Sequence, residues 1–469
     1  MQIKTFKARA VGMASVLMPL LFVAGCSSIC VDPDPRVCPT GSTNTSLTPV
    51  VEERSARPLA APVGAAPAPA TPQPDPSDAV QTAPIQLFDG PAADAGAGAA
   101  RAGAAPLAAN AGPVGAGVRI ALLLPMNSAS LGGAAEAVRA GFMAGFQRDG
   151  SGVQVELVPT GDAPDETLAA YARAAASHDL VVGPLARPAV SALASGGTVA
   201  KPTIALNHPE QRGVLPRGML VAGLSIEDEA AQVAEWAARE RPQGRVLILT
   251  GSAAWALRAA GAFEARWSAL GRTGQRFDLP SSGGRVELSA IDTLKTRIGI
   301  DPPDLVFAAL DVAELRQVVA QTGQVCAVIA CYGGSSVNPG RAPGAGVAEL
   351  NGLRLVDVPW LVRRDASAVM VYPRPDDNAQ PLYMSRLYAL GIDAFRVARD
   401  VALQPGTPLA IDGVTGQLST GGDAAFPRLQ RREAEAIYQN GDFQPAPPPV
   451  DPAATMPVNP PAAPARTGG

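Results

Sequence analysis

The chain has 469 residues, and its 38 Lys and Arg against 42 Asp and Glu give a formal net charge of −4. So balanced a charge excludes the broad basic field of a typical nucleic-acid-binding protein. The length would allow about three domains, but many of the 46 prolines and 48 glycines gather toward the two ends, which leaves fewer residues for folded structure.

Residues 1–25 have the layout of a bacterial signal peptide. Three cations, the last of them Arg9, precede an apolar run from Ala10 to Ala24, and this order is typical of an export signal. A helix that spans a bilayer needs about 20 consecutive apolar residues, whereas this run is shorter and contains a proline. We therefore expect cleavage; a retained transmembrane anchor is the alternative.

Cys26 follows directly and is the expected lipidation site. The residues before it, Phe22 to Gly25, end in small side chains and resemble the lipobox that lipoprotein signal peptidase cleaves. The product carries a diacylated, palmitate-bearing cysteine, and two or more acyl chains hold a protein stably at a membrane. Ser27 stands where Asp would favour the inner membrane, so we expect an outer-membrane lipoprotein that faces the periplasm.

Residues 26–117 are a low-complexity segment rich in proline, alanine and glycine. Runs such as Ala92 to Ala105 lack a sustained apolar period, and so little apolar surface does not offset the entropy of ordering the chain. We expect a disordered tether here and a disordered tail at residues 444–469. Pro-rich chain extends by about 3.1 Å per residue, so the tether could reach into the cell wall; a plain spacer is the simpler alternative.

Four cysteines remain besides Cys26. Cys30 and Cys38 lie in the tether, and Cys326 and Cys331 lie in one apolar stretch. The compartment expected for an exported protein permits disulfides, and of the three possible pairings the local pair Cys30–Cys38 is favoured. Because no Cys-x-x-Cys spacing occurs and the chain has only two histidines, we expect neither a metal site nor a cofactor.

Between residues 118 and 443, short apolar runs alternate with amphipathic stretches. Val118 to Leu124 has the continuous apolar character of a buried strand, and Ala134 to Arg148 places apolar and small residues on one face of a helix. The expected elements that follow are strand 153–158, helix 165–177, strand 180–182, a helix after Pro188, strand 202–206 and helix 227–239.

A second series of the same kind follows. Its expected elements are strand 245–250, helix 254–270, strand 275–279, helix 286–297, strand 305–308, helix 312–322 and strand 326–330. Strands that alternate with helices of this length form right-handed βαβ units around a parallel sheet. We therefore predict an α/β fold with two lobes, at about 118–240 and 241–380, between which a helix at 382–401 and the stretch 408–418 return.

Ligands of open α/β sheets bind beyond the carboxyl ends of the strands, and this rule selects eight candidate cleft residues. They are Asn127, Ser128, Ser130, Gly183, Pro184, Asn207, His208 and Ser252. The first three could bind a carboxylate together with the amides of the following helix. As alternatives, Asn127 or Ser130 caps that helix, and Gly183–Pro184 and Asn207 form turns.

The sequence contains no recognisable catalytic constellation. His208 titrates near neutral pH, but no matched nucleophile or carboxylate accompanies it. The chain has no Gly-x-Ser-x-Gly elbow, no Gly-Lys-Ser/Thr phosphate loop and no His-Glu-x-x-His motif, so we do not expect an enzyme. The basic pairs Arg363–Arg364 and Arg431–Arg432 are expected on solvated faces or against an acidic partner.

Several separated motifs occur in a characteristic order. They are Ile120 to Pro125 (IALLLP), the helical stretch 134–146, Leu180 to Leu185 (LVVGPL), Pro202 to Asn207 (PTIALN), Tyr388 to Phe395 (YALGIDAF) and Gly413 to Ser419 (GVTGQLS). Together they resemble the LppC/LpoA-like penicillin-binding protein activators over roughly residues 117–443. Longer members of that family carry a helical repeat domain where this chain has the tether, and the stretch 333–346 does not align.

The resemblance implies a type I periplasmic-binding-protein-like fold and a lipoprotein that binds a class A penicillin-binding protein and stimulates peptidoglycan synthesis. A solute-binding, amino-acid-type receptor of a transport system is the first alternative, because the fold alone suggests it equally well. A receptor passes its ligand to an inner-membrane permease, which an outer-membrane anchor disfavours. An enzyme is the second alternative, and a small-molecule ligand in the cleft stays open under the regulator hypothesis too.

Overall fold

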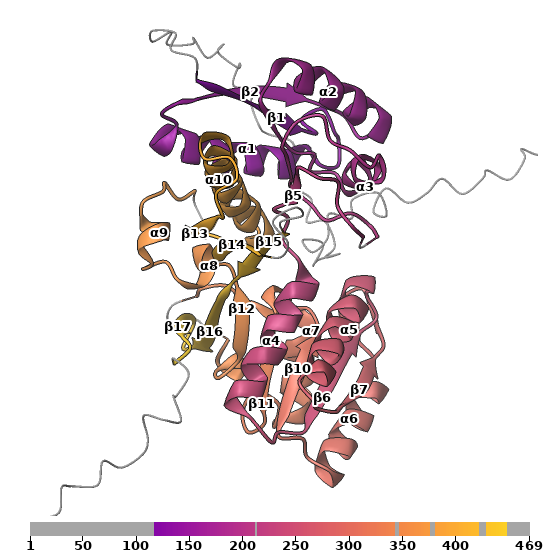
Figure 1. The fold of residues 1–469 in the computed structure, drawn as a ribbon. Helices are drawn as coiled ribbons and strands as arrows, with labels where there is room; N and C mark the ends of the chain where they lie inside the picture. The colour runs from indigo at the N-terminus through magenta and orange to yellow at the C-terminus, as the bar shows by residue number, and fades with distance from the viewer. Residues whose placement is uncertain (1–116, 212, 343–346, 376–379, 422–427, 448–469) are drawn as a thin grey trace, which may run out of the picture. The chain divides into compact units, whose positions relative to one another are not determined.

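The computed structural model describes residues 117–211, 213–342, 347–375, 380–421 and 428–447. The expected signal peptide, Cys26, Cys30, Cys38, the tether before residue 117 and the tail from residue 448 lie outside these ranges. The described chain forms an α/β fold with two main sheets (Figure 1), as the sequence predicted. Among the described residues, no helix is both long and apolar enough to cross a membrane.

The first sheet is parallel throughout and has the order β2-β1-β3-β4-β5. Its strands are β1 (Val118–Leu124), β2 (Val153–Pro159), β3 (Leu180–Val182), β4 (Thr203–Ala205) and β5 (Met219–Val221). Ile120 of β1 pairs with Val155 on one side and with Leu180 on the other. An inner strand with both faces covered is apolar along its whole length, which is the pattern of β1.

Helices cover both faces of this sheet. They are α1 (Gly132–Asp149), α2 (Pro164–Ser177), α3 (Arg187–Ser195) and, from much later in the chain, α10 (Leu382–Leu403). Successive side chains of a strand point to opposite faces. Leu122 accordingly packs in a cluster with α1 and α10, and Leu123 in a cluster with α2 and α3.

The second sheet has the order β17-β16-β12-β11-β10-β6-β7, in which β16 and β17 are antiparallel and the others parallel. Its strands are β6 (Val246–Gly251), β7 (Gly274–Leu279), β10 (Leu305–Ala309), β11 (Ala330–Gly333), β12 (Arg354–Asp357), β16 (Ala434–Gln439) and β17 (Asp442–Pro445). One face packs against α4 (Ile226–Glu240) and α5 (Ala254–Ala269), and the other against α6 (Leu288–Ile300) and α7 (Val312–Thr322) (Figure 1).

The strand expected at 326–330 is shifted along the chain. The structure starts β11 at Ala330, and residues 326–328 form a turn between the bridged residues Val325 and Ile329. The apolar run from Val325 to Cys331 carries no period that separates a buried turn from a buried strand. The short strands β5, β12, β16 and β17 were not expected, and β17 extends two residues into the expected tail.

Helix α4 packs on the second sheet. The Trp236 ring meets the Tyr332 ring of β11 edge to face, with 5.6 Å between centroids, and α4 shares a core cluster with α5 and β10. The chain therefore leaves the first sheet at Ala222 to Ser225, earlier than the expected lobe limit near residue 240. Helical periodicity shows which face of a helix is buried but not which sheet covers it.

The chain passes between the two sheets at three places in the part that the structure describes. β5 leads into α4, β12 leads toward α10 through residues 358–381, and Glu433 joins β15 to β16. A small antiparallel sheet stands at the last passage and consists of β13 (Ala410–Asp412), β14 (Gln417–Gly421) and β15 (Arg428–Arg432). Helix α10 and this sheet are the return that the sequence predicted for residues 382–401 and 408–418.

Helices α1 and α10 approach each other through glycines. A Cβ on Gly141 would lie 1.8 Å from the carbonyl oxygen of Tyr388, and a Cβ on Gly391 would lie 2.1 Å from that of Val138. Beside them, Phe142 of α1 meets Phe395 of α10 edge to face. Because backbone occupies the space that a side chain would need, these two helices pack this closely only with glycine at both positions.

We expect Gly391→Ala to destabilise the protein by about 3 kcal/mol, because a methyl group there forces α1 and α10 apart, and overpacking that shifts side chains and backbone typically costs about 1–3 kcal/mol. Urea unfolding followed by circular dichroism measures the loss. The matched control is Gly261→Ala in α5, where a Cβ meets nothing within 4 Å and alanine should be neutral or stabilising by up to about 1 kcal/mol. Equal effects of the two changes would contradict the close helix contact.

Candidate functional site

The loop after β1 carries three of the predicted cleft residues. The Ser128 hydroxyl accepts a hydrogen bond from the Leu131 backbone N–H at 2.7 Å and lies 3.3 Å from the Ser130 hydroxyl. Asn127 is exposed, and its backbone N–H donates to the Thr160 carbonyl. The expected capping of α1 by Asn127 or Ser130 is therefore wrong, and it is Ser128 that closes the turn into the helix by satisfying a backbone amide.

Gly183, Pro184 and Asn207 lie together at the ends of β3 and β4. Gly183 has φ of +116°, and a Cβ there would lie 2.1 Å from the Leu123 carbonyl oxygen, so the turn requires glycine. The buried Asn207 side chain donates from Nδ2 to the Leu185 carbonyl at 3.2 Å and accepts the N–H of the next residue at 2.8 Å. The amide thus holds the two strand-end loops together.

His208 lies where the chain leaves the first sheet. Its Nε2 is 3.1 Å from the Gly223 carbonyl oxygen, which also accepts a hydrogen bond from Arg431 at 2.8 Å. Burial lowers the pKa of His208, so the ring is neutral at pH 7 and donates from Nε2 to this carbonyl. In this position the histidine makes a structural contact and not a proton-transfer pair.

Ser252 stands at the end of β6 and is exposed. Its hydroxyl accepts the Ser281 backbone N–H at 2.9 Å, which attaches the hairpin of β8 (Ser281–Ser282) and β9 (Arg285–Val286) to the strand end. The structure therefore brings Gly183, Asn207 and His208 together on the first lobe. The hydroxyl of Ser252 instead makes its hydrogen bond within the second lobe.

A buried ion pair joins the end of β12 to α10. Arg386 donates from Nε and Nη2 to the two carboxylate oxygens of Asp357 at 2.9 and 2.6 Å, and both side chains are at most 3% exposed. Nη2 also donates to the Ser335 carbonyl at 2.9 Å, and Asn338 donates to Asp357 at 2.6 Å. A bidentate pair whose carboxylate oxygens accept further hydrogen bonds can be buried.

Two buried glutamates flank this pair. Glu229 of α4 accepts the Ser335 backbone N–H at 2.9 Å, and burial, aided by the Asp357 carboxylate, raises the pKa of Glu229 to about 7. The backbone of Glu433 exchanges two hydrogen bonds with the Gln232 side chain, at 2.9 and 3.0 Å. Burial raises the pKa of Glu433 well above its usual range, a shift that favours the uncharged acid.

Arg431 connects the first passage between the sheets to the last. Its Nη1 and Nη2 donate to the carbonyls of Gly223 and Ala222 at 2.8 and 2.6 Å, and its Nε lies 3.1 Å from the Thr415 hydroxyl oxygen. The Thr415 hydroxyl donates to Asp393 of α10 at 2.6 Å. These hydrogen bonds form three neighbouring groups, which we call together the crossing network: Glu229, Asp357 and Arg386; Gln232 and Glu433; and Asp393, Thr415 and Arg431.

The sequence did not reveal this network, because its members are scattered over some two hundred residues. The expectation of a solvated face is wrong for Arg431, which is half-buried and makes one hydrogen bond from each guanidinium nitrogen, whereas its neighbour Arg432 is exposed. One signal was available: Arg386 and Asp393 stand in a largely apolar helix, and a charge that faces a core needs a partner.

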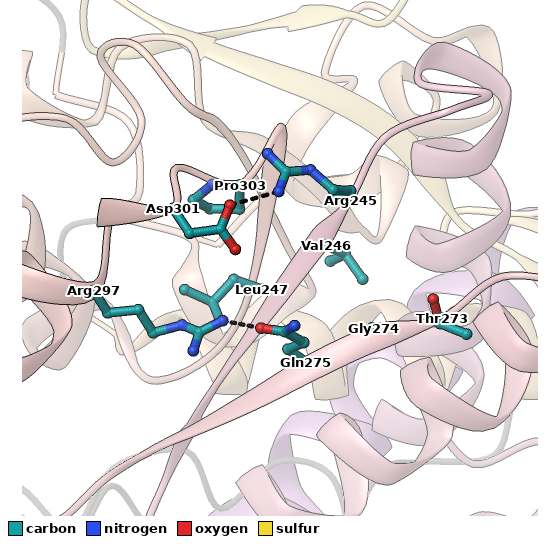
Figure 2. A pocket seen from close by; sticks show the side chains of 9 residues that line it. All are labelled: Arg245, Val246, Leu247, Thr273, Gly274, Gln275, Arg297, Asp301 and Pro303. Carbon is teal, nitrogen blue, oxygen red and sulfur yellow. Dashed lines mark hydrogen bonds and ion pairs between the residues drawn. The ribbon is translucent and has the colours of Figure 1, made fainter. Parts of the chain in front are cut away.

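A cavity of about 240 Å³ lies at the amino ends of β6 and β7, at the opposite end of these strands from Ser252. Figure 2 shows its lining: Arg245 pairs with Asp301 at 2.6 Å, and Arg297 binds Gln275. Because these charged groups are paired with neighbours, we do not take the cavity as the functional site. Across the described ranges, no group of three or more His, Cys, Asp or Glu is placed to hold a metal ion.

Comparisons with known proteins agree with this architecture. The family model described as "LppC putative lipoprotein" matches residues 115–282 and 289–441. The chain is 24% identical over 360 residues to the penicillin-binding protein activator LpoA of Photobacterium profundum, covering 70% of this chain and 57% of that one. It is 26% identical over 301 residues to LpoA of Dickeya chrysanthemi, covering 55% and 43%. The chain thus spans about half the length of these relatives.

Two solved structures share the fold. One is the C-domain of LpoA (YraM) from Haemophilus influenzae, described as a regulator of PBP1A, with a TM-score of 0.56 at 20% identity over 70% of this chain and 99% of that one. The other is a putative branched-chain amino acid ABC transporter from Chromobacterium violaceum, with a TM-score of 0.55 at 30% identity over 68% and 100%. The two-lobed, type I periplasmic-binding-protein-like fold is therefore as predicted.

We expect Glu229→Gln to flatten the pH dependence of stability. The pKa of the carboxyl rises from 4.5 to about 7 on folding, so the folded protein keeps a proton that the unfolded chain has lost. Stability is therefore greatest below the unfolded pKa and falls as the pH rises through this window. The wild type should lose up to about 3 kcal/mol that the variant does not.

Urea unfolding of the wild type and the variant across this pH window measures the difference between their free energies of unfolding. Glu433 and His208 contribute to the pH dependence of both proteins, so their contributions cancel in this difference to a first approximation. The matched control is Glu287→Gln, a change of an exposed glutamate. Parallel stability profiles of Glu229→Gln and the wild type would refute the assignment.

Proposed function

The chain belongs to the LppC family, and we propose that it binds and activates a class A penicillin-binding protein and so regulates peptidoglycan synthesis. The observation that carries the proposal is the family match, which extends from residue 115 to residue 441 and takes in both main sheets. The two curated relatives above are named as penicillin-binding protein activators, which supports the same function for this chain.

The site supports action by binding and not by catalysis. Ser128, Asn207 and Ser252, which the sequence offered as ligand-binding groups, make hydrogen bonds within the protein. His208 is neutral and bound to a backbone carbonyl. A protein that activates a partner enzyme needs no reacting group itself. We therefore propose that the chain is not an enzyme and that it acts through a protein surface.

We propose further that lipid on Cys26 anchors the protein in the outer membrane and that the segment before residue 117 spans the distance to the partner. The family description as a lipoprotein supports the anchor. We propose lobe limits that follow the passages between the sheets. One lobe comprises residues 117–223 with α10 and the three-stranded sheet, and the other runs from α4 to β12 and adds β16 and β17.

A solute receptor is the second candidate function. The observation that favours it is the 30% identity to the Chromobacterium violaceum protein, all of which this chain covers. A receptor retains its ligand in the closed cleft and often co-purifies with it. Denaturing the purified protein and searching the supernatant by mass spectrometry therefore distinguishes the two functions. A stoichiometric amino-acid-like molecule supports the receptor, whereas the absence of such a molecule supports the regulator.

We expect the full mature chain, with Cys26→Ser to prevent lipidation, to raise glycan polymerisation and cross-linking when it is titrated into the same organism's class A penicillin-binding protein. The rise should saturate, because it reports occupancy of one binding surface. A solute-binding protein of the same fold is the control at equal concentration. If the variant is folded by circular dichroism yet leaves both rates unchanged and does not bind, the activator proposal is refuted.

A further inference from the structure

The chain reverses direction tightly between α7 and β11. Gly323 ends α7 at φ of +65°, and Cys326 itself has φ of +64°. The Gln324 carbonyl accepts the N–H groups of Val328 and Ile329 at 2.8 and 3.0 Å, and the Cys326 N–H donates to the Ile329 carbonyl at 3.1 Å. The turn therefore closes on itself and returns residue 326 to the start of β11.

This reversal brings two thiols to the same face of the second sheet. Cys331 is the second residue of β11, and its side chain joins the core cluster under α6 and α7, whereas its neighbours Ala330 and Tyr332 join the cluster on the other face. Cys326 belongs to the same cluster as Cys331, and in the structure both are buried, free thiols. An interaction with the Cys331 side chain also contributes to the raised pKa of the Cys326 thiol, as expected of neighbouring groups.

We propose that Cys326 and Cys331 form a disulfide bond in the exported protein. The proposal rests on the export that is part of the proposed function, because only an oxidising compartment preserves such a bond. The bond closes a six-residue loop whose tip, Val328, is 80% exposed. It attaches this loop to the amino end of β11, the strand that lies between β10 and β12 in the second sheet.

The oxidation requires a disulfide donor, and an exported thiol–disulfide oxidoreductase supplies it. One cysteine thiolate attacks the oxidoreductase disulfide, forms a mixed disulfide and releases the first thiolate of that enzyme. The second cysteine then displaces the oxidoreductase, which leaves as a dithiol. Two protons and two electrons pass from the cysteine pair to the oxidoreductase.

The bond forms before the core closes. In the folded protein, contact with Cys331 and burial raise the pKa of the Cys326 thiol, and a buried, protonated thiol reacts slowly because the thiolate is the nucleophile. A chain that folds with reduced cysteines should therefore stay reduced, whereas a chain that is oxidised on export should resist mild reductant.

Trypsin provides a direct test, because it releases one peptide, Gln317 to Arg341, that contains both cysteines. Cys30 and Cys38 fall on other peptides, since Arg36 separates them. We expect the full chain from exported material, denatured and alkylated without reductant, to yield the Gln317–Arg341 peptide unalkylated and lighter by two hydrogen atoms. Reduction before alkylation should add two alkyl groups to it.

Two alkyl groups on this peptide without reduction would overturn the proposal, and so would a link to a peptide with Cys30 or Cys38. A second measurement uses the full chain with Cys30→Ser and Cys38→Ser. Reduction should lower its Tm by about 2–5 °C, as expected for a short closed loop. The same chain that also carries Cys331→Ser should show no shift, and an equal shift in both would likewise overturn the proposal.

The chemical readout keeps this inference separate from the proposed activity. An intact disulfide in a chain that fails to activate the synthase would count against the activator function alone. Two free thiols in a chain that does activate it would count against the disulfide alone.

Discussion

The buried pair of Arg386 with Asp357 is the interaction on which the connection between the lobes depends. It joins α10, which packs on the first sheet, to the last residue of β12 in the second. Taking two charges out of water is costly, and only the bidentate geometry with its additional donors offsets the cost. Removing either partner would leave the other charge buried alone, a change that typically costs about 3–5 kcal/mol.

The rest of the crossing network extends the same constraint to all three passages. Arg431 of β15 donates to the backbone of the first passage, between β5 and α4. Gln232 of α4 donates to the backbone of Glu433, which forms the third passage. Hydrogen bonds of the network thus reach the backbone beside every passage between the sheets that the structure describes. The raised pKa values of Glu229 and Glu433 favour their uncharged forms, which lowers the cost of burying the network.

The sequence predicted those elements whose signal is local. Helix α7 was located to the residue because Asp311 and Glu314 form a capping box and Gly323 ends the helix. The start of β11 was misplaced because an apolar run does not separate turn from strand, and α4 was given to the first lobe because its covering sheet is not encoded locally. The crossing network could not be predicted, since Arg386 and Asp357 meet only once the topology has brought α10 back to the first sheet.

Helix α10 has one more consequence, which concerns the order of biosynthesis. The face of the first sheet that carries Leu122 is covered by α1 together with α10, yet α10 begins well over a hundred residues after β5 has ended. A nascent chain that emerges from its N-terminus therefore exposes an unfinished apolar layer until almost the whole domain has appeared. Long-range closure of this kind is slow and leaves partly folded chains prone to aggregation.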